Sequence, residues 1–505
     1  MHDNTIMDNH LYSVAQLREI ERAAYAGLAP GSLMRRAGEA AARFALELLG
    51  DRRDLPVLLL AGPGNNGGDA LEMAAVLADA GIDATVLHLP GQRDTTEEAA
   101  SAHERARGGT VGFIDMLPPE GQWGLVVDGL FGIGLARPLE GEYRELVAAL
   151  DGLRCPVLAL DVPSGLDADT GAVIGPDGVA VRATHTITFL GDKPGLHTAD
   201  GRDHAGQVRV EMLGVEQSRL PAPVARLASA EVFAGRLAPR RHNTHKGSFG
   251  DVAVLGGAHG MVGAAVLAAR GALYAGAGRT FVAMPDAGSG PGYDGVQPEI
   301  MFRPAEDFDF AGRTLVVGPG MGGSAGAMRL LARALDSDSP LVIDADALTL
   351  AGASPDLLAR LAGRGAAAVL TPHPLEAARL LGVTAAAVQA DRLEAAREIA
   401  LRTQATVILK GSGSMIAAPG GDLLINPTGN PGLATAGSGD VLAGICGALL
   451  AQGWPAWEAA AGGAWIHGAA ADLLVAHGIG PVGMTAGELP AAARAVLNLL
   501  VAEKT

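Results

Sequence analysis

Short apolar runs alternate with alanine-rich amphipathic segments along nearly the whole chain. Parallel strands buried on both faces read as continuous apolar runs, and the helices between them carry one apolar stripe. We therefore expect an α/β protein, with helices on both faces of mostly parallel sheets. The expected strands are 56–60, 84–89, 125–127, 156–160, 184–190, 251–255, 315–317, 340–343, 367–370 and 406–409. Helices are expected at 71–80 and, as a long region, from Gly439 to the C-terminus.

Two domains are expected, because 505 residues exceed what one hydrophobic core usually organises. The alternation is interrupted between Leu220 and Arg241, where three prolines and a basic cluster occur. Such a composition is typical of a connection between domains. We place the domains at residues 1–217 and 229–505, joined by a linker at 218–228.

The composition limits the partners and the compartment. The formal net charge of −17 repels a phosphate backbone, so nucleic acid is not an expected partner. Only Cys155 and Cys446 are present, which is typical of a reducing compartment and predicts a cytoplasmic protein. Residues 1–10 lack the apolar segment of a signal peptide, and the apolar stretch from Val441 onward is interrupted by polar residues. No membrane partner is expected, whereas glycine-rich flat faces favour a homo-oligomer.

A glycine-rich turn follows the first predicted strand. Residues 62–67 have GxGxxG spacing and precede a helix expected to begin near Asp69. Such a turn presents backbone N–H groups and a positive helix end to an anion. The acid that holds ribose hydroxyls in the ordinary dinucleotide fingerprint is missing after the next strand, so a tight turn without a ligand stays an alternative. Asn65, Asn66 and Asp69 add side-chain oxygens, which a hard cation prefers.

Polar residues also follow two further predicted strands. Asp128 follows one strand, and Asp161 and Ser164 follow the next. Ligands of parallel sheets collect beyond the carboxyl ends of the strands, so we expect these side chains to converge on the first glycine loop. Either aspartate alone is more typical of a helix or turn cap.

The first half resembles the NAD(P)H-hydrate epimerase family, and the stretches that carry the resemblance, in order, are 63–69, 128–135, 159–171 and 193–196. The resemblance implies a Rossmann-like three-layer αβα domain. It implies a potassium ion held by Asn66, Asp128 and Ser164. Asp161 is the candidate catalytic residue, with Lys193 a second candidate by position. The residues implied to line the substrate, besides Asp161, are Asn65, Asn66, Gly67, Gly68, Asp69, Gly132, Ile133, Gly134, Leu135, Ala136, Arg137 and Pro138.

The second half carries another phosphate-binding device. No GxxxxGK[ST] loop occurs in the sequence, which excludes a P-loop ATPase. The segment 437–440, Gly-Ser-Gly-Asp, leads into an apolar helix, so its backbone N–H groups can form an anion hole. Asp440 in that first turn is suited to accept the proton of a hydroxyl that attacks phosphorus. Taken alone, a carboxylate that complements the helix dipole explains Asp440 equally well.

This segment resembles the anion hole of ribokinase-like kinases, and further stretches narrow the resemblance to the NAD(P)H-hydrate dehydratases. They are 245–247, 256–265, 298–301, 318–322, 344–348, 371–374, 410–414 and 430–442. The resemblance implies a ribokinase-like α/β domain with Asp440 as the catalytic base. The residues implied to contact ADP or AMP are Lys410, Gly411, Ser412, Gly413, Ser414 and Gly439. Those implied to face the hydrated nicotinamide beside Asp440 are Ala264, Gly322 and His373.

Two of these residues have simpler explanations from the sequence alone. A histidine after a buried strand is more often a cap or a core residue than a catalytic one. Lys410 ends a predicted strand, where an exposed lysine is common. The chain has only four lysines, however, which favours a function for the one beside a glycine turn.

Together the resemblances imply a bifunctional repair enzyme for hydrated NADH and NADPH (NADHX and NADPHX). The first domain would interconvert the R and S forms, and the second would dehydrate the S form with ADP and Mg²⁺, giving AMP and phosphate. A ribokinase-like small-alcohol kinase fused to a nucleotide-binding domain stays an alternative, because it would use the same anion hole and base. A nucleotide-binding scaffold and an ordinary dehydrogenase are disfavoured, the first by the hydroxyl base and the second by the missing ribose acid.

Overall fold

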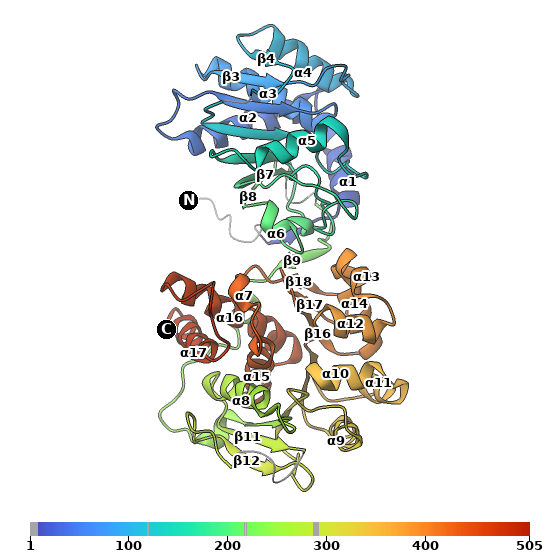
Figure 1. Cartoon of the computed structure of the whole chain (residues 1–505), viewed down its shortest axis with the longest axis vertical. Helices are drawn as coiled ribbons and strands as arrows, with labels where there is room; N and C mark the ends of the chain where they lie inside the picture. Colours follow the sequence, from blue (N-terminus) through green and yellow to red (C-terminus); the bar gives the residue numbers. More distant parts are fainter. Residues whose placement is uncertain (1–8, 119–120, 217, 219, 286–291, 505) are drawn as a thin grey trace. The chain divides into compact units, whose positions relative to one another are not determined.

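The computed structural model describes residues 9–118, 121–216, 218, 220–285 and 292–504. The chain divides into two compact units, Met1–Arg226 and Leu227–Thr505 (Figure 1). The division falls inside the stretch 218–228, and strand β9 (Ala225–Leu227) spans it. Strand β9 pairs antiparallel with β1 (His10–Leu11). The prediction that residues 1–10 are not a signal peptide falls mostly on residues 1–8, which lie outside the described residues.

Unit 1 is built on a parallel sheet with the strand order β4-β3-β2-β5-β6-β7-β8. Its strands are β2 (Val57–Ala61), β3 (Ala84–Leu87), β4 (Gly112–Ile114), β5 (Leu125–Gly129), β6 (Val157–Leu160), β7 (His185–Phe189) and β8 (Gln207–Glu211). The chain order reverses between β2 and β5, so the loops that follow these two strands diverge and leave a crevice, where ligands of such sheets bind.

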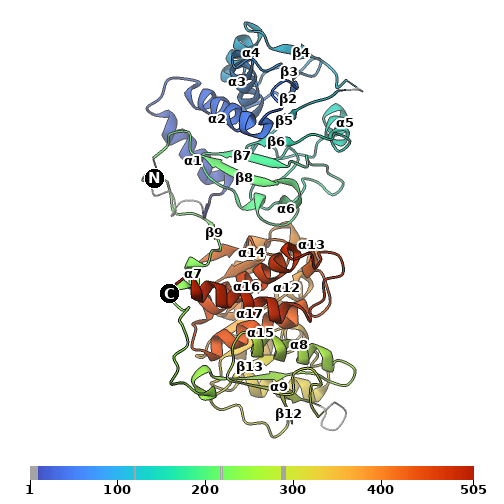
Figure 2. The ribbon, with the colours of Figure 1, turned by 90° about the vertical axis from the view of Figure 1, so that its left-hand side faces the viewer.

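Helices cover both faces of this sheet, as the two views show (Figures 1 and 2). Successive strand residues point to opposite faces: Leu59 and Val127 pack in the core under α1 to α3, and Leu58 and Val126 pack in the core under α5. The helices are α1 (Val14–Tyr25), α2 (Ser32–Leu49), α3 (Asn65–Asp79), α4 (Glu97–Arg107), α5 (Gly141–Leu150) and α6 (Gly201–His204), with a 3₁₀ turn η1 (Pro194–Leu196).

Helix α3 begins at Asn65, four residues before the expected start at Asp69. A Cβ atom at Gly67 would collide with the backbone of Gly62, and one at Gly68 would lie 2.5 Å from the side chain of Met34. Gly67 therefore lets the first turn of α3 lie against the end of β2, and Gly68 lets it lie against α2. Gly67 and Gly68 were expected in the loop before the helix, but they belong to the first turn of α3. Close packing explains why both positions are glycine.

Unit 2 has a larger sheet, in which the order of its own strands is β18-β17-β16-β15-β14-β13-β10-β11-β12. These strands are β10 (Asp251–Leu255), β11 (Arg279–Met284), β12 (Met301–Pro304), β13 (Thr314–Val317), β14 (Leu341–Ile343), β15 (Ala368–Leu370), β16 (Thr406–Leu409), β17 (Met415–Ala417) and β18 (Leu423–Ile425). All pairs from β12 to β16 are parallel, and β17 and β18 are antiparallel additions. The chain order reverses between β13 and β10, which gives unit 2 a switch point of its own.

Helices α8 and α15–α17 lie on one side of this sheet and α9–α14 on the other (Figure 1). Their bounds are α7 (Glu231–Ala234), α8 (Val262–Tyr274), α9 (Ala325–Leu335), α10 (Ala345–Gly352), α11 (Pro355–Ala362), α12 (Pro374–Leu381), α13 (Ala385–Ala390), α14 (Arg392–Thr403), α15 (Ser438–Ala451), α16 (Ala456–Ala476) and α17 (Leu489–Ala502). Two 3₁₀ turns are η3 (Lys246–Phe249) and η4 (Pro431–Leu433). Of the described helices α16 is long and apolar enough to cross a membrane, but 67% of its apolar window is buried inside the structure, as in a core helix.

Helices α8 and α15 pack backbone against backbone. A Cβ atom at Gly271 of α8 would lie 2.6 Å from the carbonyl oxygen of Val441, and one at Gly444 of α15 would collide with the carbonyl of Ala268. Only glycine permits this approach at both points. The contact fixes the start of α15, which carries Asp440, against the helix that carries Ala264.

Candidate functional site

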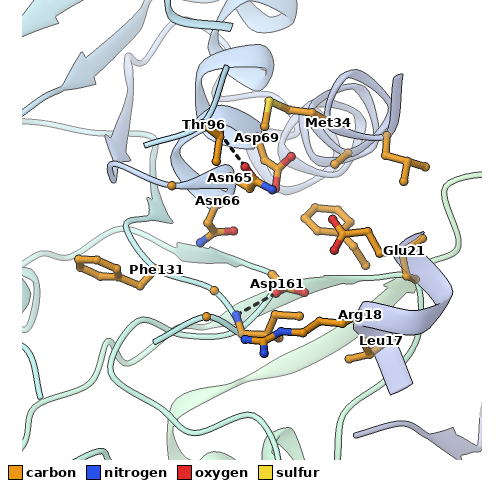
Figure 3. Close-up of a pocket in the computed structure, with 18 of the residues that line it drawn as sticks. Leu17, Arg18, Glu21, Met34, Asn65, Asn66, Asp69, Thr96, Phe131 and Asp161 are labelled. Carbon is orange, nitrogen blue, oxygen red and sulfur yellow. Dashed lines mark hydrogen bonds between the residues drawn. The ribbon is translucent and has the colours of Figure 1, made fainter. Parts of the chain in front are cut away.

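A cavity of about 460 Å³ opens at the switch point of unit 1 (Figure 3). The loops after β2 and β5, the end of β6 and residues of α1 and α2 form its walls. Of the predicted substrate residues, those that line it are Asn65, Asn66, Asp69, Gly132, Ile133, Gly134, Leu135 and Asp161. Gly67, Gly68, Ala136, Arg137 and Pro138 are not among the lining residues, and the first two serve the packing of α3.

Asp161 and Lys193 form an ion pair in the cavity wall. Lys193 Nζ lies 2.9 Å from Asp161 Oδ1 and also donates to Thr188 Oγ1 at 2.5 Å, so this buried ammonium is well anchored. The other carboxylate oxygen, Oδ2, accepts the N–H of Ile133 at 3.3 Å. Asp161 has a φ of +66°, which is uncommon for a residue other than glycine and is found preferentially at functional sites. The pair is placed to hold or release a proton at the cavity surface.

Further acidic groups face the same cavity from α1 and α3. The side chains of Glu21, Asp69 and Asp161 point into one space (Figure 3). Burial raises the pKa of Asp69 well above its ordinary value, and the neighbouring charges of Asp161, Glu21 and Glu98 raise it further. Burial and then Asp161 likewise raise the pKa of Glu21. The cavity therefore keeps carboxyl groups that hold their protons more tightly than free carboxyl groups do.

Sequence reasoning missed Glu21, because no motif surrounds it. The readable signal is only the start of its helix: Ser13 Oγ accepts the N–H of Gln16 at 3.3 Å, and the Gln16 side chain accepts the N–H of Ser13 at 3.1 Å. This capping box predicts a helix, and the apolar residues Leu17 and Ile20 predict its buried face. Nothing local indicates that the helix edge borders a cavity.

Asn66, Asp128 and Ser164 lie together beside the cavity. Ser164 donates to Asp128 twice, from Oγ at 2.6 Å and from its backbone N–H at 2.8 Å. Burial raises the pKa of Asp128 to about 6, against the lowering effect of these hydrogen bonds. Within the described residues, both amide atoms of Asn66 are buried without a hydrogen-bond partner. An orphaned amide oxygen next to a buried carboxylate and hydroxyl is a set of hard oxygen donors that fits a monovalent cation such as potassium.

Unit 2 gathers its predicted site residues around Lys410, which follows β16. Lys410 Nζ lies 2.7 Å from Asp344 Oδ1 and 4.0 Å from Glu376 Oε2. Burial lowers the pKa of this lysine, but the charges of Asp344, Glu376 and Asp440 outweigh it and the net pKa is raised. A Cβ atom at Gly439 would lie 3.1 Å from Nζ, so the glycine leaves room for the ammonium at the start of α15. A cation and the positive end of a helix thus meet where phosphate is predicted to bind.

Asp440 is in the first turn of α15, directly beside this cluster. The residue before the helix, Gly437, has a φ of +90° and lets the chain turn tightly into it. Burial raises the pKa of Asp440 to about 7, and the charge of Asp344 adds to this while Lys410 opposes it. A carboxylate with a pKa near neutrality is suited to general base catalysis.

Of the remaining predicted substrate residues, Gly322 is in the loop after β13, His373 precedes α12 and Ala264 is in the first turn of α8. Gly322 donates its N–H to Asp346 Oδ2 at 2.8 Å, and the charge of Asp346 helps to raise the pKa of Asp440. His373 caps α12: its Nδ1 accepts the N–H of Leu375 at 3.1 Å. The capping role that the sequence suggested for His373 is thus present, and contact with nicotinamide stays a prediction. Ala264 adjoins Gly320, whose Cβ would lie 3.3 Å from that of Ala264.

Arg392 contacts the start of the predicted nucleotide loop 410–414. Sequence reasoning did not predict this residue. Its Nη2 donates to the carbonyl oxygens of Leu409 at 3.4 Å and Lys410 at 3.3 Å. A Cβ atom at Gly411, which has a φ of +143°, would lie 2.6 Å from Arg392 Nη1. The arginine is buried, and burial lowers its pKa to about 10. Gly411 is therefore required both by its backbone conformation and by the arginine behind it.

Comparison with known proteins connects both units to one chemistry. A family model described as NAD(P)H-hydrate dehydratase matches residues 252–492, and one described as YjeF-related protein N-terminus matches residues 30–195. A bifunctional NAD(P)H-hydrate repair enzyme Nnr of Coxiella burnetii is 38% identical, over 97% of this chain and 99% of its own length. The enzyme of the same name from Escherichia coli is 37% identical, over 96% of this chain and 93% of its own length.

Among solved structures, an ADP/ATP-dependent NAD(P)H-hydrate dehydratase from Bacillus subtilis, co-crystallised with ATP/Mg²⁺, is 29% identical with a TM-score of 0.47. The match covers 54% of this chain and 97% of the Bacillus subtilis chain. The predicted α/β class is confirmed, because unit 1 has a parallel sheet and unit 2 a mostly parallel one, each with helices on both faces. Because both family models match in order and the relatives align nearly end to end, the chain belongs to the family of bifunctional NAD(P)H-hydrate repair enzymes.

Proposed function

We propose that this chain repairs hydrated NADH and NADPH, with unit 1 interconverting the R and S forms and unit 2 dehydrating the S form at the expense of ADP. The observation that carries the proposal is the position of Asp440. It lies beside Lys410 at the glycine-lined start of α15, with a pKa of about 7. Transfer of a phosphoryl group to an alcohol requires a base for the hydroxyl proton and positive groups for the phosphate charge. Asp440 would be that base, and Lys410 and the start of α15 would supply the positive charge.

In the dehydratase reaction, Asp440 takes the proton of the substrate hydroxyl while that oxygen attacks the β-phosphorus of ADP. An oxygen–phosphorus bond forms and AMP leaves. The N–H groups of residues 437–439 and the ammonium of Lys410 stabilise the charge on the transferred group. Phosphate then departs with the electrons of the carbon–oxygen bond, and loss of a ring proton restores the double bond of the reduced nicotinamide. Mg²⁺ bound with the nucleotide supplies charge neutralisation of its phosphate oxygens.

In the epimerase reaction, Asp161 and Lys193 are the proposed proton-holding pair, and the carboxyl of Asp69, whose pKa is raised first by burial, faces them across the cavity. Protonation of the hydroxyl lets it leave as water with the electrons of its carbon–oxygen bond, and the ring nitrogen's electron pair stabilises the ring cation. Water then adds to the opposite face of the ring and gives one proton back to the pair, which exchanges the two forms. We propose that Asn66, Asp128 and Ser164 hold a potassium ion, which would offset the charge of Asp128 and of an anionic substrate. Gly132 to Leu135 then form the wall on which the nicotinamide rests.

The proposal is tested with Asp440→Asn, which keeps the shape of the side chain and removes the base. The purified protein is mixed with hydrated NADH and ADP, and the absorbance of the reduced ring is followed. We expect the variant to lose recovery by at least about a hundredfold, the contribution of a general base. Exchange of the two epimers, followed by chromatography, should continue at the unchanged rate. Recovery at the wild-type rate in the variant would refute the assignment.

A small-alcohol kinase is the second candidate, because the anion hole and Asp440 would serve it equally. Product analysis separates the two: a dehydratase yields reduced nicotinamide and free phosphate, whereas a kinase leaves a stable phosphate ester.

We also propose a cytoplasmic location, which the two free cysteines support. We propose in addition that the chain forms a homo-oligomer, and light scattering would measure its mass.

A further inference from the structure

A second group of polar side chains lies behind the wall of the unit 1 cavity and takes no part in the proposed reactions. His88 follows β3, Asp94 is in the next loop, and His103 is on α4. His103 Nδ1 lies 3.0 Å from Asp94 Oδ2, and His88 Nε2 lies 4.0 Å from Asp94 Oδ1. One ligand atom from each of the three residues falls within 4.8 Å of the others.

Two atoms of this group are buried without a partner. Among the described residues, neither His88 Nε2 nor Asp94 Oδ1 has a hydrogen-bond partner, although both atoms are shielded from solvent. Leaving such atoms unsatisfied costs about 1–3 kcal/mol each. Their separation of 4.0 Å is too long for a hydrogen bond. It is close to the roughly 3.4 Å between two ligands of one tetrahedral zinc ion, whose ligand bonds are about 2.0–2.1 Å.

We propose that His88, Asp94 and His103 bind a zinc ion. Two imidazole nitrogens and one carboxylate oxygen are a donor set that zinc accepts, with water in the fourth position. The side chains are 13%, 15% and 13% exposed, so an ion can reach the site from solvent while the protein shields it. The ion would satisfy both orphaned atoms at once.

Arg107 sets the state of His103 before the ion binds. Its Nε donates to His103 Nε2 at 2.9 Å, so the ring proton is on Nδ1, which faces Asp94. Zinc replaces that proton, which moves to Nε2, and the Arg107 hydrogen bond is lost. The guanidinium already lies 4.7 Å from the centre of the Phe113 ring, which can retain it by a cation–π contact.

The site would fasten one wall of the substrate cavity. Asp94 is followed by Thr95 and Thr96, which both line that cavity. Thr96 Oγ1 donates to Asn65 Oδ1 at 2.8 Å, and the backbone N–H of Thr95 donates to the carbonyl oxygen of Pro63 at 2.8 Å. An ion that joins this loop to β3 and α4 therefore holds the glycine turn indirectly, which makes the site structural rather than catalytic.

The test uses the full-length protein after removal of metals by a chelator. Zinc is titrated by calorimetry, and cobalt(II) is titrated as a visible-absorbing substitute. We expect one ion per chain, and we expect His88→Gln and His103→Gln each to weaken binding by at least about tenfold. The control is His197→Gln, because His197 also pairs with an aspartate, Asp192, at 2.7 Å, but no third ligand joins that pair in the described part of the chain.

Two further measurements distinguish residues that bind an ion from residues that only support the fold. Zinc should raise the thermal unfolding midpoint of the wild type and of His197→Gln but not of His88→Gln, provided that circular dichroism shows all three folded. Arg107→Ala should bind zinc several-fold more tightly, because it removes the donor that opposes the proton shift. Absence of binding in the wild type, or equal binding in His88→Gln, would overturn the proposal whether or not the repair activities are present.

Discussion

Burial raises the pKa of Asp440, and the charges of Asp344, Asp346 and Glu376 add to this effect while the ammonium of Lys410 opposes it. At a pKa of about 7 the carboxylate is half protonated near neutrality, and only the ionised form accepts a proton from the substrate. The dehydratase rate with the S form should therefore rise as the pH increases through about 7 and then level off. Single-turnover rates over a pH series check this, and a flat profile through neutral pH would contradict it.

The same shift has an opposite effect on stability. Because the pKa of Asp440 is raised from 3.8 to about 7, the folded state binds the proton more tightly than the unfolded state does. Its stabilising contribution is full at low pH and is lost as the pH rises from about 3.8 through about 7. Asp440→Asn should thus unfold at a higher temperature than the wild type at pH above 7, with the gap closing in acid. A less stable variant in alkaline solution would contradict the sign.

Asn66 offers the sharpest test of the proposed potassium site, because among the described residues its buried amide has no hydrogen-bond partner. Asn66→Ala removes one oxygen ligand without adding charge. Epimer exchange should then require at least about tenfold more potassium, as expected when a ligand shell is weakened. Exchange rates across a potassium series, with a bulky organic cation keeping ionic strength constant, measure this. The dehydratase rate of the same protein, which should not change, is the control.

The sequence predicted those site residues that follow strands. Ser164 donates to Asp128 near the end of β5, and Asp161 after β6 lines the cavity, because parallel strands end at one edge of the sheet, a rule that needs no coordinates. Glu21 and Arg392 were out of reach, since each enters its site only through the packing of a helix whose neighbours lie far away in the chain.

Among the elements, the buried central strands were predicted almost to the residue: β10 and β16 match their expected bounds, β6 and β14 differ by one residue at an end, and β2 is shifted by one residue. The strands that were missed include edge and hairpin strands. Strand β8 (Gln207–Glu211) is a half-exposed edge strand with charged residues, and β17 and β18 are three residues each. A short strand that is paired by a hairpin carries too few residues to show a period.

The loop between β16 and β17 gives a prediction at this scale. Gly411→Ala places a Cβ against Arg392 at a backbone angle that alanine rarely adopts, so the loop 410–414 must shift. The KM for ADP should rise about tenfold, the effect of a lost contact of about 1.4 kcal/mol, while epimer exchange is unchanged. Gly420→Ala is the matched control, because its added Cβ meets open space. An equal effect of both substitutions on KM would contradict the account.

At the scale of the whole molecule, two compact units each carry their own core and their own site. The epimer made by one site is a diffusible product, so the two activities do not need to reside in one polypeptide. Asp161→Asn alone should recover only the S form, and Asp440→Asn alone should recover neither. An equimolar mixture of the two variants should recover both forms completely, as measured by ring absorbance. A mixture that stops at the S fraction would show that the intact chain passes substrate directly.

The glycine contact between α8 and α15 has a consequence for motion in unit 2. Where two backbones touch with no side chain between them, neither helix can slide or tilt without opening a void. The start of α15, which carries Asp440, and helix α8 therefore behave as a rigid pair. Positions 271 and 444 therefore tolerate nothing larger than hydrogen, and any closure over nucleotide must come from segments outside this helix pair.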